Sequence, residues 1–458
     1  MAVDKLGLEF TASLPETVDA FNDAMDDYMV FSGEPVGKLL TIAEIDPDFA
    51  MGYCLTGCLR LFGGVSSAHP RVSLELRAAK ARRSRVSARE QAHIDAFETA
   101  ARGEISRAGK MWDAILADQP LDMMAAKCAH ECYYLVGEVD NMKKSVLDIL
   151  PAWNETVPYY GFLLGMGAFG LEEAGDYREA EEMGRKAQGI EPRDAWAVHA
   201  VAHVMQMEGR CQEGIRWLDD TAGGWGDAVW LAGHLWWHQC LPLIDDGQFD
   251  RVIQIFDDHI SDCDQDMVTR LMDCTSLLWR LELQGVDVGA RWDALVEKWM
   301  VHMDEHALAF TDAHLAMTLA TAGGEKKLAR FLESQHAYIE GNANTNSKVI
   351  DKIGRDLCKG MIAYCRGDFD GAADLIYPIR DHIWHIGGSN AQREVFHQTL
   401  ASAFIKAGRF AEARAFLVPA IEKTPTTGLL QNLGNALAGL GDNDGAQEAQ
   451  ARALEMRQ

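Results

Sequence analysis

The sequence lacks the signals that mark membrane and secreted proteins. No apolar stretch among its 458 residues reaches the roughly 20 residues that a membrane-spanning helix needs. The first residues, MAVDKLGLEFTAS, lack the basic start and apolar run of a secretory signal. The ten cysteines contain no Cys-x-x-Cys pair, and Cys54/Cys58 and Cys128/Cys132 have the helical spacing typical of buried thiols. We therefore expect a cytoplasmic protein that does not cross a membrane.

Basic residues are scarce in this chain. It holds 43 Lys and Arg against 69 Asp and Glu, so its formal net charge is −26. A surface with this charge repels the phosphate backbone of DNA and RNA. We expect no nucleic-acid partner for the chain as a whole.

Strand patterns are also scarce, and one helical phrase recurs in their place. Few runs alternate in period two, and clusters of β-branched residues are rare. The phrase consists of Gly, any residue, an aromatic or apolar residue, and then acidic residues and Ala. Its copies begin at Gly175, Gly247, Gly367, Gly408 and Gly441, with weaker copies at Gly103, Gly137 and Gly209.

The spacing of these copies indicates the repeat type. From Gly103 to Gly137 and from Gly175 to Gly209 the distance along the chain is 34 residues. A period near 34 predicts helix-turn-helix units of the tetratricopeptide type, in which a glycine with positive φ closes the first helix. Prolines stand where the second helix should stop, at Pro120, Pro192 and Pro425. We expect an all-α fold, a tetratricopeptide-type array of helical hairpins.

The chain is divided into two parts on this basis. We interpret residues 1–95 as an N-terminal helical region packed on the array, and residues 96–458 as tetratricopeptide-like repeats that form one continuous superhelix. Where the phrase fades, we expect less regular hairpins with a turn at Gly323-Gly324. Residues 221–226 are interpreted as a loop that lengthens one connection.

Two histidine pairs lie between residues 194 and 245. His199 with His203, and His234 with His238, are four residues apart, so each pair shares one face of a helix. In tetratricopeptide proteins, which this chain resembles, the helix before each turn glycine lines the concave face. We therefore expect both pairs to face one groove.

Asp312 and His314 precede the next expected turn. In the same frame they lie on a further inner helix, at about the level of His238. This arrangement gathers five imidazoles and a carboxylate near one another.

Three interpretations of the histidines compete. The first is a metal site, because neutral imidazole is a good ligand for zinc or iron. The second is a metal-free pocket in which the histidines act as general acid or base or as hydrogen-bond donors. The third is packing of the inner wall. Neither pair has the Glu of a His-Glu-x-x-His motif, so the sequence favours a site without a metal. Apolar walls would come from Trp196, Trp230, Trp236 and Trp237.

Three weaker candidates complete the set. Residues 386–394 contain two glycines and a capping box of Ser389 with Gln392, and the following helix N-terminus beside Arg393 either holds an anion or is an ordinary cap. His130 with Glu131 forms an acid/base pair or is buried beside two tyrosines. His302 and His306 are flanked by acidic residues, which indicates an exposed face.

Four segments resemble the tetratricopeptide repeat protein 38 family. They are DAWAVHAVAH at 194–203, LAGHLWWH at 231–238, DAH at 312–314 and GGSNAQR at 387–393. The resemblance covers most of the chain in the same order and implies a helical-repeat fold. It implies no particular reaction, cofactor or catalytic residue.

These observations favour a protein that binds a ligand or partner segment in a His/Trp-rich concave pocket. The alternative is an enzyme for hydrolysis or proton transfer on a small molecule, with or without a metal. The expected partner is a small molecule or peptide segment; a homo-oligomer is left open, and no cofactor is identified. The catalytic candidates are His203, His238, Asp312 and His314, and the ligand-binding candidates are Trp196, His199, His234, Trp237, Asn390 and Arg393.

Overall fold

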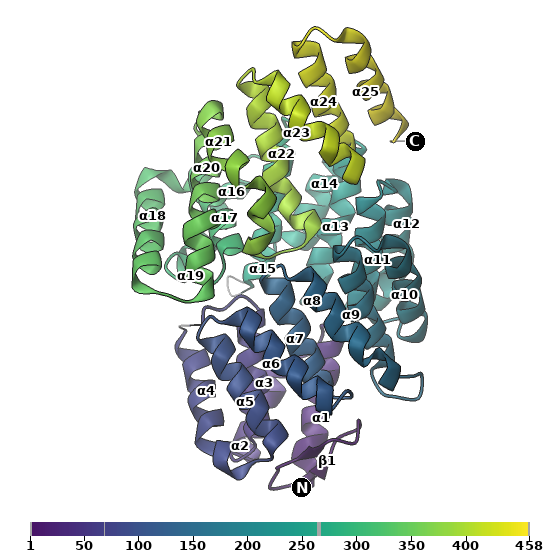
Figure 1. The fold of residues 1–458 in the computed structure, drawn as a ribbon, viewed down its shortest axis with the longest axis vertical. Helices are drawn as coiled ribbons and strands as arrows, with labels where there is room; N and C mark the ends of the chain where they lie inside the picture. Colours follow the sequence, from purple (N-terminus) through teal and green to yellow (C-terminus); the bar gives the residue numbers. More distant parts are fainter. Residues whose placement is uncertain (1, 68, 263–266, 457–458) are drawn as a thin grey trace. The chain divides into compact units, whose positions relative to one another are not determined.

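Helices make up nearly all of the structure (Figure 1). The computed structural model describes residues 2–67, 69–262 and 267–456. Within these residues the only strands are β1 (Ala2–Val3) and β2 (Glu9–Phe10), which pair antiparallel with Ala2 opposite Phe10. None of the described helices combines the length and apolar character needed to cross a membrane. The predicted all-α fold is confirmed.

Contacts divide the chain into two compact units. The first comprises Met1–Val201, Thr221–Ala232 and Asn344–Asn346, and the second comprises Ala202–Asp220, Gly233–Ala343 and Ser347–Gln458. The boundary passes through α11 (Ala195–Met207) and α12 (Cys211–Trp225), so each of these helices belongs partly to either unit. The division at residue 95 stays a prediction.

The first unit consists of sequential helical hairpins. In it, α6 packs on α7 and α9 packs on α10. Its complete helices are α1 (Pro15–Met29), α2 (Pro35–Ile45), α3 (Ala50–Phe62), α4 (Pro70–Arg82), α5 (Ala88–Ala101), α6 (Ile105–Asp118), α7 (Met123–Leu135), α8 (Val139–Ile149), α9 (Tyr160–Glu173) and α10 (Tyr177–Ile190), with short 3-10 turns at Arg83–Arg85 and Leu150–Ala152.

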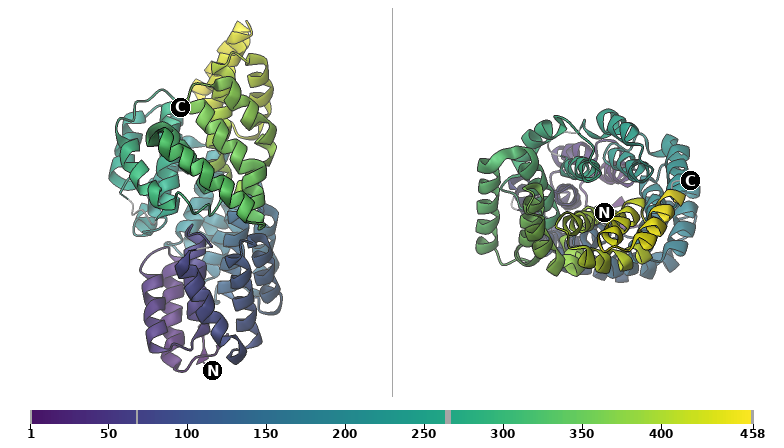
Figure 2. Two further views of the ribbon diagram at one scale, coloured as in Figure 1. Left: turned by 90° about the vertical axis from the view of Figure 1, so that its left-hand side faces the viewer. Right: turned by 90° about the horizontal axis from the view of Figure 1, so that it is seen from above.

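The second unit continues with hairpins that are interrupted by irregular turns. From α20 to α25 each helix packs against the next in the sequence (Figure 2). Its α-helices, of which α13 and α19 begin with residues of the first unit, are α13 (Ala232–Asp245), α14 (Phe249–Ile255), α15 (Val268–Leu283), α16 (Arg291–Trp299), α17 (Ala309–Thr318), α18 (Gly324–Gly341), α19 (Thr345–Val349), α20 (Arg355–Cys365), α21 (Phe369–Ile376), α22 (Asn390–Lys406), α23 (Phe410–Lys423), α24 (Thr427–Gly439) and α25 (Asn443–Glu455).

Turns of 3-10 or π type adjoin these helices. The 3-10 turns are Met300–His302 and Tyr377–Ile386, and the π turns are Phe256–Ile260, Leu319–Gly323 and Ile350–Gly354. They fall mostly in the stretch where the repeat phrase fades, which agrees with the less regular hairpins predicted there.

Glycine closes the first helix of each predicted repeat. All eight glycines of the recurring phrase have positive φ, between 68° and 87°. An L residue at such a position would bring its Cβ too close to a carbonyl oxygen, so glycine is needed where the chain reverses. The turn predicted at Gly323-Gly324 is present, and Gly324 has a φ of 76°.

The expected loop at residues 221–226 is wrong. The helix α12 continues to Trp225, whose indole Nε1 donates a hydrogen bond to Thr221 Oγ1 at 3.2 Å. Trp225 is fully buried, and Gly224 lets this turn of the helix lie against the carbonyl of Pro192. Burial of the tryptophan and the close approach of Gly224 therefore outweigh the low helix propensity of the two glycines.

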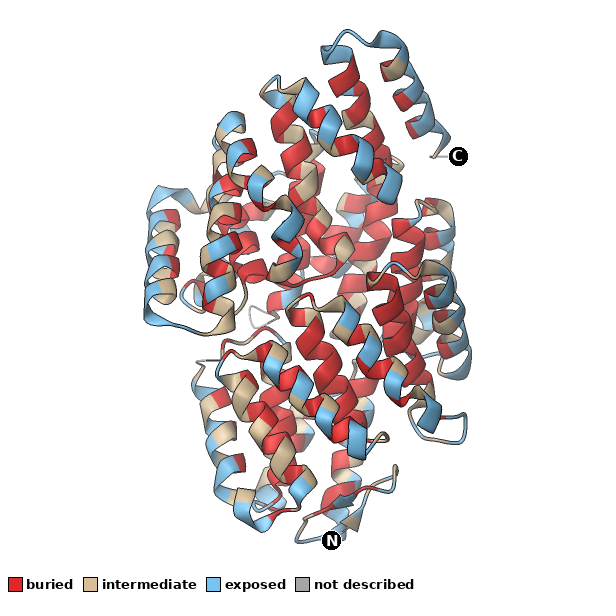
Figure 3. Cartoon of the chain, viewed as in Figure 1, coloured by how far each residue is buried: buried red, intermediate tan, exposed pale blue. Residues whose placement is uncertain are grey.

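Buried side chains line the faces that neighbouring helices share (Figure 3). In the second unit, Trp237, Trp279, Trp292 and Trp299 belong to one continuous hydrophobic cluster. In the first unit every residue from Gly161 to Glu173 on α9 is buried. Close packing of this kind depends on small residues where helix backbones approach each other.

We predict opposite effects for alanine at two helical glycines of the first unit. A Cβ at Gly170 would lie 2.8 Å from the Cα of Lys143 on α8, so Gly170→Ala forces the backbones apart and should lower the free energy of unfolding by about 1–3 kcal/mol. A Cβ at Gly189 meets nothing within 4 Å, so Gly189→Ala should raise it by roughly 0.5–1 kcal/mol. Urea unfolding of both variants measures the difference. A stabilising Gly170→Ala would contradict this account of the packing.

Candidate functional site

The first histidine pair is carried by α11. The carboxylate of Asp194 begins this helix, because its Oδ1 accepts the backbone N–H groups of Trp196 and Ala197 at 3.0 and 3.1 Å. Gly209, with a φ of 70°, ends the hairpin turn that follows. The helical spacing places His199 and His203 one turn apart on the same face of α11.

The second pair is carried by α13, close to α15. A Cβ at Gly233 would lie 2.1 Å from the guanidinium carbon of Arg270 on α15, so the Arg270 side chain occupies the space that a larger residue at position 233 would need. His234 and His238 follow directly, one turn apart and both buried. The guanidinium of Arg270 therefore packs against α13 beside the start of the histidine face.

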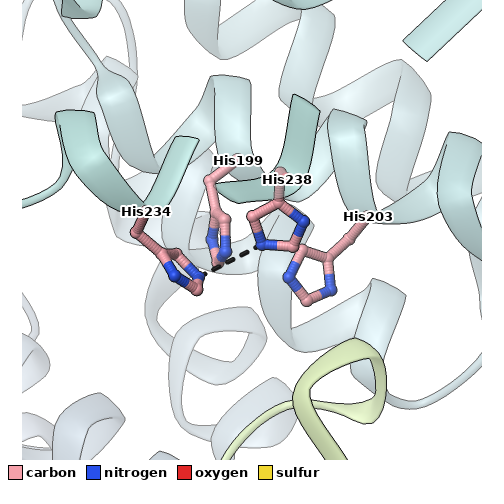
Figure 4. A group of neighbouring side chains, drawn as sticks. All are labelled: His199, His203, His234 and His238. Atoms are coloured by element: carbon pink, nitrogen blue, oxygen red, sulfur yellow. Dashed lines mark hydrogen bonds between the residues drawn. The ribbon is translucent and has the colours of Figure 1, made fainter. Parts of the chain in front are cut away.

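Three imidazole rings meet in the second unit (Figure 4). The rings of His203 and His238 have centroids 4.4 Å apart, and those of His234 and His238 are 4.6 Å apart. The Nε2 atoms of His234 and His238 are separated by 3.1 Å. One ring nitrogen of each of the three lies within 4.8 Å of the others. Figure 4 also draws His199 from the preceding turn of α11.

Asp273 on α15 orients His234. Its two carboxylate oxygens lie 2.9 and 3.0 Å from His234 Nδ1. Because a carboxylate only accepts, His234 Nδ1 carries a proton and donates to Asp273, and in the tautomer with this single proton Nε2 of His234 accepts the Nε2–H of His238. Asp273, His234 and His238 therefore form a buried hydrogen-bonded chain.

Trp237 forms one wall beside this chain. Its ring stacks on His234 with an interplanar angle of 10° and a centroid distance of 5.2 Å. The guanidinium carbon of Arg280 lies 5.2 Å from the centroid of the same tryptophan. Trp236 instead stacks on His259 at 4.2 Å. The predicted wall is thus present for Trp237, and Trp236 faces another histidine.

A partly open hollow of ≈ 220 Å³ adjoins His238. Gln206, Arg210, Cys211 and Pro242 are among the residues that line it, and all belong to the second unit. This space includes open solvent, and the part enclosed by the protein has room for roughly one water molecule near the ring of His238.

Asp312 and His314 have other neighbours. Asp312 binds His306 Nδ1 at 3.0 Å and accepts from Gln335 Nε2 at 2.8 Å. His314 Nδ1 donates to the carbonyl of Phe310 at 2.8 Å, and burial lowers the pKa of His314 to about 4. Asp312 therefore belongs to a second polar cluster with His306 and Gln335, while His314 is neutral at pH 7.

The expectation of an exposed face at His302 and His306 is wrong. Both are buried, and they do not share a helix, because α16 ends at Trp299 and only a short 3-10 turn, Met300–His302, follows. His306 has a φ of 44° and reaches Asp312 and Ser334 through its two ring nitrogens. The flanking acidic residues misled the prediction because the chain reverses within this segment.

The turn before α22 has the geometry of an ordinary cap. The capping box is confirmed, with Ser389 N donating to Gln392 Oε1 and Gln392 N donating to Ser389 Oγ. Arg393 donates to Asn390 Oδ1 at 2.8 Å and to the carbonyls of Gly387 and Gly388. The guanidinium therefore binds the turn of its own chain.

Trp196 lies in an aromatic group of the first unit. Its Nε1 donates to His130 Nε2 at 3.2 Å, and its ring stacks with Phe31 at a centroid distance of 5.7 Å. The ammonium of Lys127 lies 5.1 Å from the same ring and pairs with Glu131 at 2.8 Å. Burial lowers the pKa of His130 well below its ordinary value. His130 is therefore a buried, neutral acceptor.

Sequence reasoning missed Asp273 and Arg280. Both are buried on α15, together with Arg270. These three charged residues recur at intervals of three and seven, which places them on one face of a helix that is mostly apolar. Charges at such spacing inside an apolar helix are the signal that could have located them.

Comparison with known proteins supports the repeat type. Residues 426–458 match the tetratricopeptide repeat family. The fold is a tetratricopeptide-type helical array. Among solved structures, a human IFIT1 dimer with PPP-AAAA is 12% identical with a TM-score of 0.43, covering 98% of this chain and 96% of that one. Yeast Tom70 is 12% identical with a TM-score of 0.22, covering 79% and 93%.

We predict that Asp194 makes stability depend on pH. Burial raises its pKa from 3.8 to about 7, so the folded protein holds a proton that the unfolded chain has released. The contribution of Asp194 to the free energy of unfolding is therefore fully present below pH 3.8, and it is lost as the pH rises towards 7. Asp194→Asn keeps the capping oxygen and removes the titration. Between pH 5 and pH 8 the free energy of unfolding, measured with urea, should fall by about 2–3 kcal/mol more for the native chain than for the variant. Equal losses would contradict the raised pKa.

Proposed function

We propose that this helical-repeat protein binds a small ligand at the cluster of His203, His234 and His238. The observation that carries the proposal is the convergence of three buried imidazoles on one point of the second unit. Three imidazoles in one place supply the nitrogen atoms with which a polar ligand or an ion can be bound. The hollow beside His238 supports access from outside the helices.

The other proposed ligand-binding residues differ in how well they suit this role. His199 lies on the same face of α11 as His203, and Trp237 stacks on His234. A ligand-binding role stays a prediction for Trp196, Asn390 and Arg393, because the hydrogen-bond partners described for them belong to the protein itself. The proposed ligand is accordingly recognised through imidazole nitrogens beside one aromatic wall.

A second candidate function is acid/base catalysis. The chain from Asp273 through His234 to His238 favours it, because a carboxylate that orients one imidazole increases the basicity of the group beyond it. Hydrolysis or proton transfer on a small molecule would then use His238, with His203 beside it. The catalytic roles of Asp312 and His314 stay predictions.

The broader assignments are proposals too. Membership of the tetratricopeptide repeat protein 38 family is supported by the four motifs quoted from the sequence. A cytoplasmic location is supported by the described cysteines, which are all free thiols. The net charge of −26 argues for a small molecule or peptide segment as partner rather than a nucleic acid. The proposal leaves a homo-oligomer open.

Replacement of two cluster histidines tests the binding proposal. We expect fragments that bind the native chain in ligand-observed NMR to bind His203→Gln/His238→Gln at least 10-fold more weakly, because both imidazoles are lost. Glutamine retains a polar side chain of moderate size, so circular dichroism should show an intact helical fold.

The matched control is His336→Gln on α18. His336 is exposed and pairs with Glu340, away from the cluster's described contacts. This variant should bind the same fragments as the native chain does. Equal binding by the folded double variant would place the ligand site elsewhere.

A further inference from the structure

The histidine cluster has the donor atoms and spacing of a transition-metal site. We propose that it binds one divalent first-row transition metal ion through Nε2 of His234, Nε2 of His238 and one ring nitrogen of His203. This inference rests on the proposed function, since it names the class of ligand held by the same side chains. Sequence patterns favoured a site without a metal because they lack a metalloprotease motif; the positions of the nitrogens lead to a different conclusion.

The distances suit a tetrahedral ion. Two imidazole nitrogens that bind zinc at about 2.1 Å in tetrahedral geometry are about 3.4 Å apart. Nε2 of His234 and Nε2 of His238 are 3.1 Å apart. A hydrogen bond between two rings explains that separation, but it does not explain why a third ring places a nitrogen within 4.8 Å of both. A shared ion accounts for all three.

Asp273 supplies the orientation that metal-binding histidines usually have. It accepts a hydrogen bond from His234 Nδ1–H, so the lone pair of this ring is on Nε2, the nitrogen that faces His238. Such a carboxylate–histidine pair fixes the tautomer and raises the basicity of the ligand. Metal binding through Nε2 of His238 requires the proton on that nitrogen to move to Nδ1 of the same ring, so that both rings bind as neutral imidazoles.

The choice of metal follows from the donor type. Three neutral imidazoles favour zinc, copper, iron or nickel over calcium and magnesium, which prefer oxygen ligands. The positive charge of Arg280, beyond Trp237, would repel a cation, and the negative charge of Asp273 opposes this repulsion. The affinity of the site for a metal ion is therefore decided by its nitrogen ligands. Three protein ligands leave a fourth position for water or an exogenous molecule.

Cobalt(II) is the direct probe of this site. The full chain is stripped with a chelator, incubated with Co²⁺ and dialysed, and its metal content and visible absorption are measured. We expect about one ion per chain and the intense d–d bands of four-coordinate cobalt. These bands should disappear when added zinc displaces the cobalt. Less than stoichiometric binding, or the weak bands of six-coordinate cobalt, would overturn the proposal.

Variants locate the ion. His234→Gln/His238→Gln should abolish stoichiometric binding, whereas the exposed control His336→Gln should retain it. Asp273→Asn leaves all three ligands in place and should lower the affinity by about 10–100-fold. If the double variant unfolds, Asp273→Asn still decides the question: an unchanged affinity in that folded variant would contradict the proposal.

Failure of this inference is distinguishable from failure of the proposed function. Fragment binding that depends on His203 and His238 in a chain that takes up no cobalt would refute the metal and support a metal-free ligand site. If the native chain takes up no cobalt, and fragments bind His203→Gln/His238→Gln as well as they bind the native chain, both proposals are refuted.

Discussion

Antiparallel packing of neighbouring helices is the constraint on which the rest of the structure depends. Each hairpin closes where glycine adopts positive φ, and the eight glycines of the recurring phrase all do so. A side chain there would favour a different turn, at a cost of roughly 1–2 kcal/mol, and the second helix would leave the first at another angle. Small residues such as Gly170 then let the backbones meet at short range.

The candidate site is a consequence of that packing. His203 and the pair on α13 lie on helices that immediately precede turn glycines, Gly209 and Gly247. The turns set the register of these helices, and Gly233 leaves room beside α13 for the side chain of Arg270 on α15. Imidazoles that are polar, buried and brought together in this way need partners, which Asp273 and the neighbouring rings provide.

Helix α15 connects the polar interior of the second unit. Asp273 binds His234, while Arg280 lies against Trp237 and donates to the carbonyl of Ala391 at the start of α22 at 2.8 Å. Burial lowers the pKa of Arg280 to about 10, which still leaves it charged at neutral pH. A buried charge needs compensation, and nearby Glu394, Asp245 and Asp273 provide it at longer range. The histidine cluster thus lies within a polar network of opposite charges.

The sequence by itself determined the features that depend on neighbours along the chain. The period near 34, the turn glycines, the capping box at Ser389 and the one-turn spacing of His234 and His238 all involve residues within a few positions or a regular repeat. Only the tertiary structure decided which groups face the histidines. Asp273 is 39 residues from His234, and no local pattern encodes that pairing. It also decided that His306 is buried against Asp312, because burial depends on how the chain folds back and not on the charge of adjacent residues.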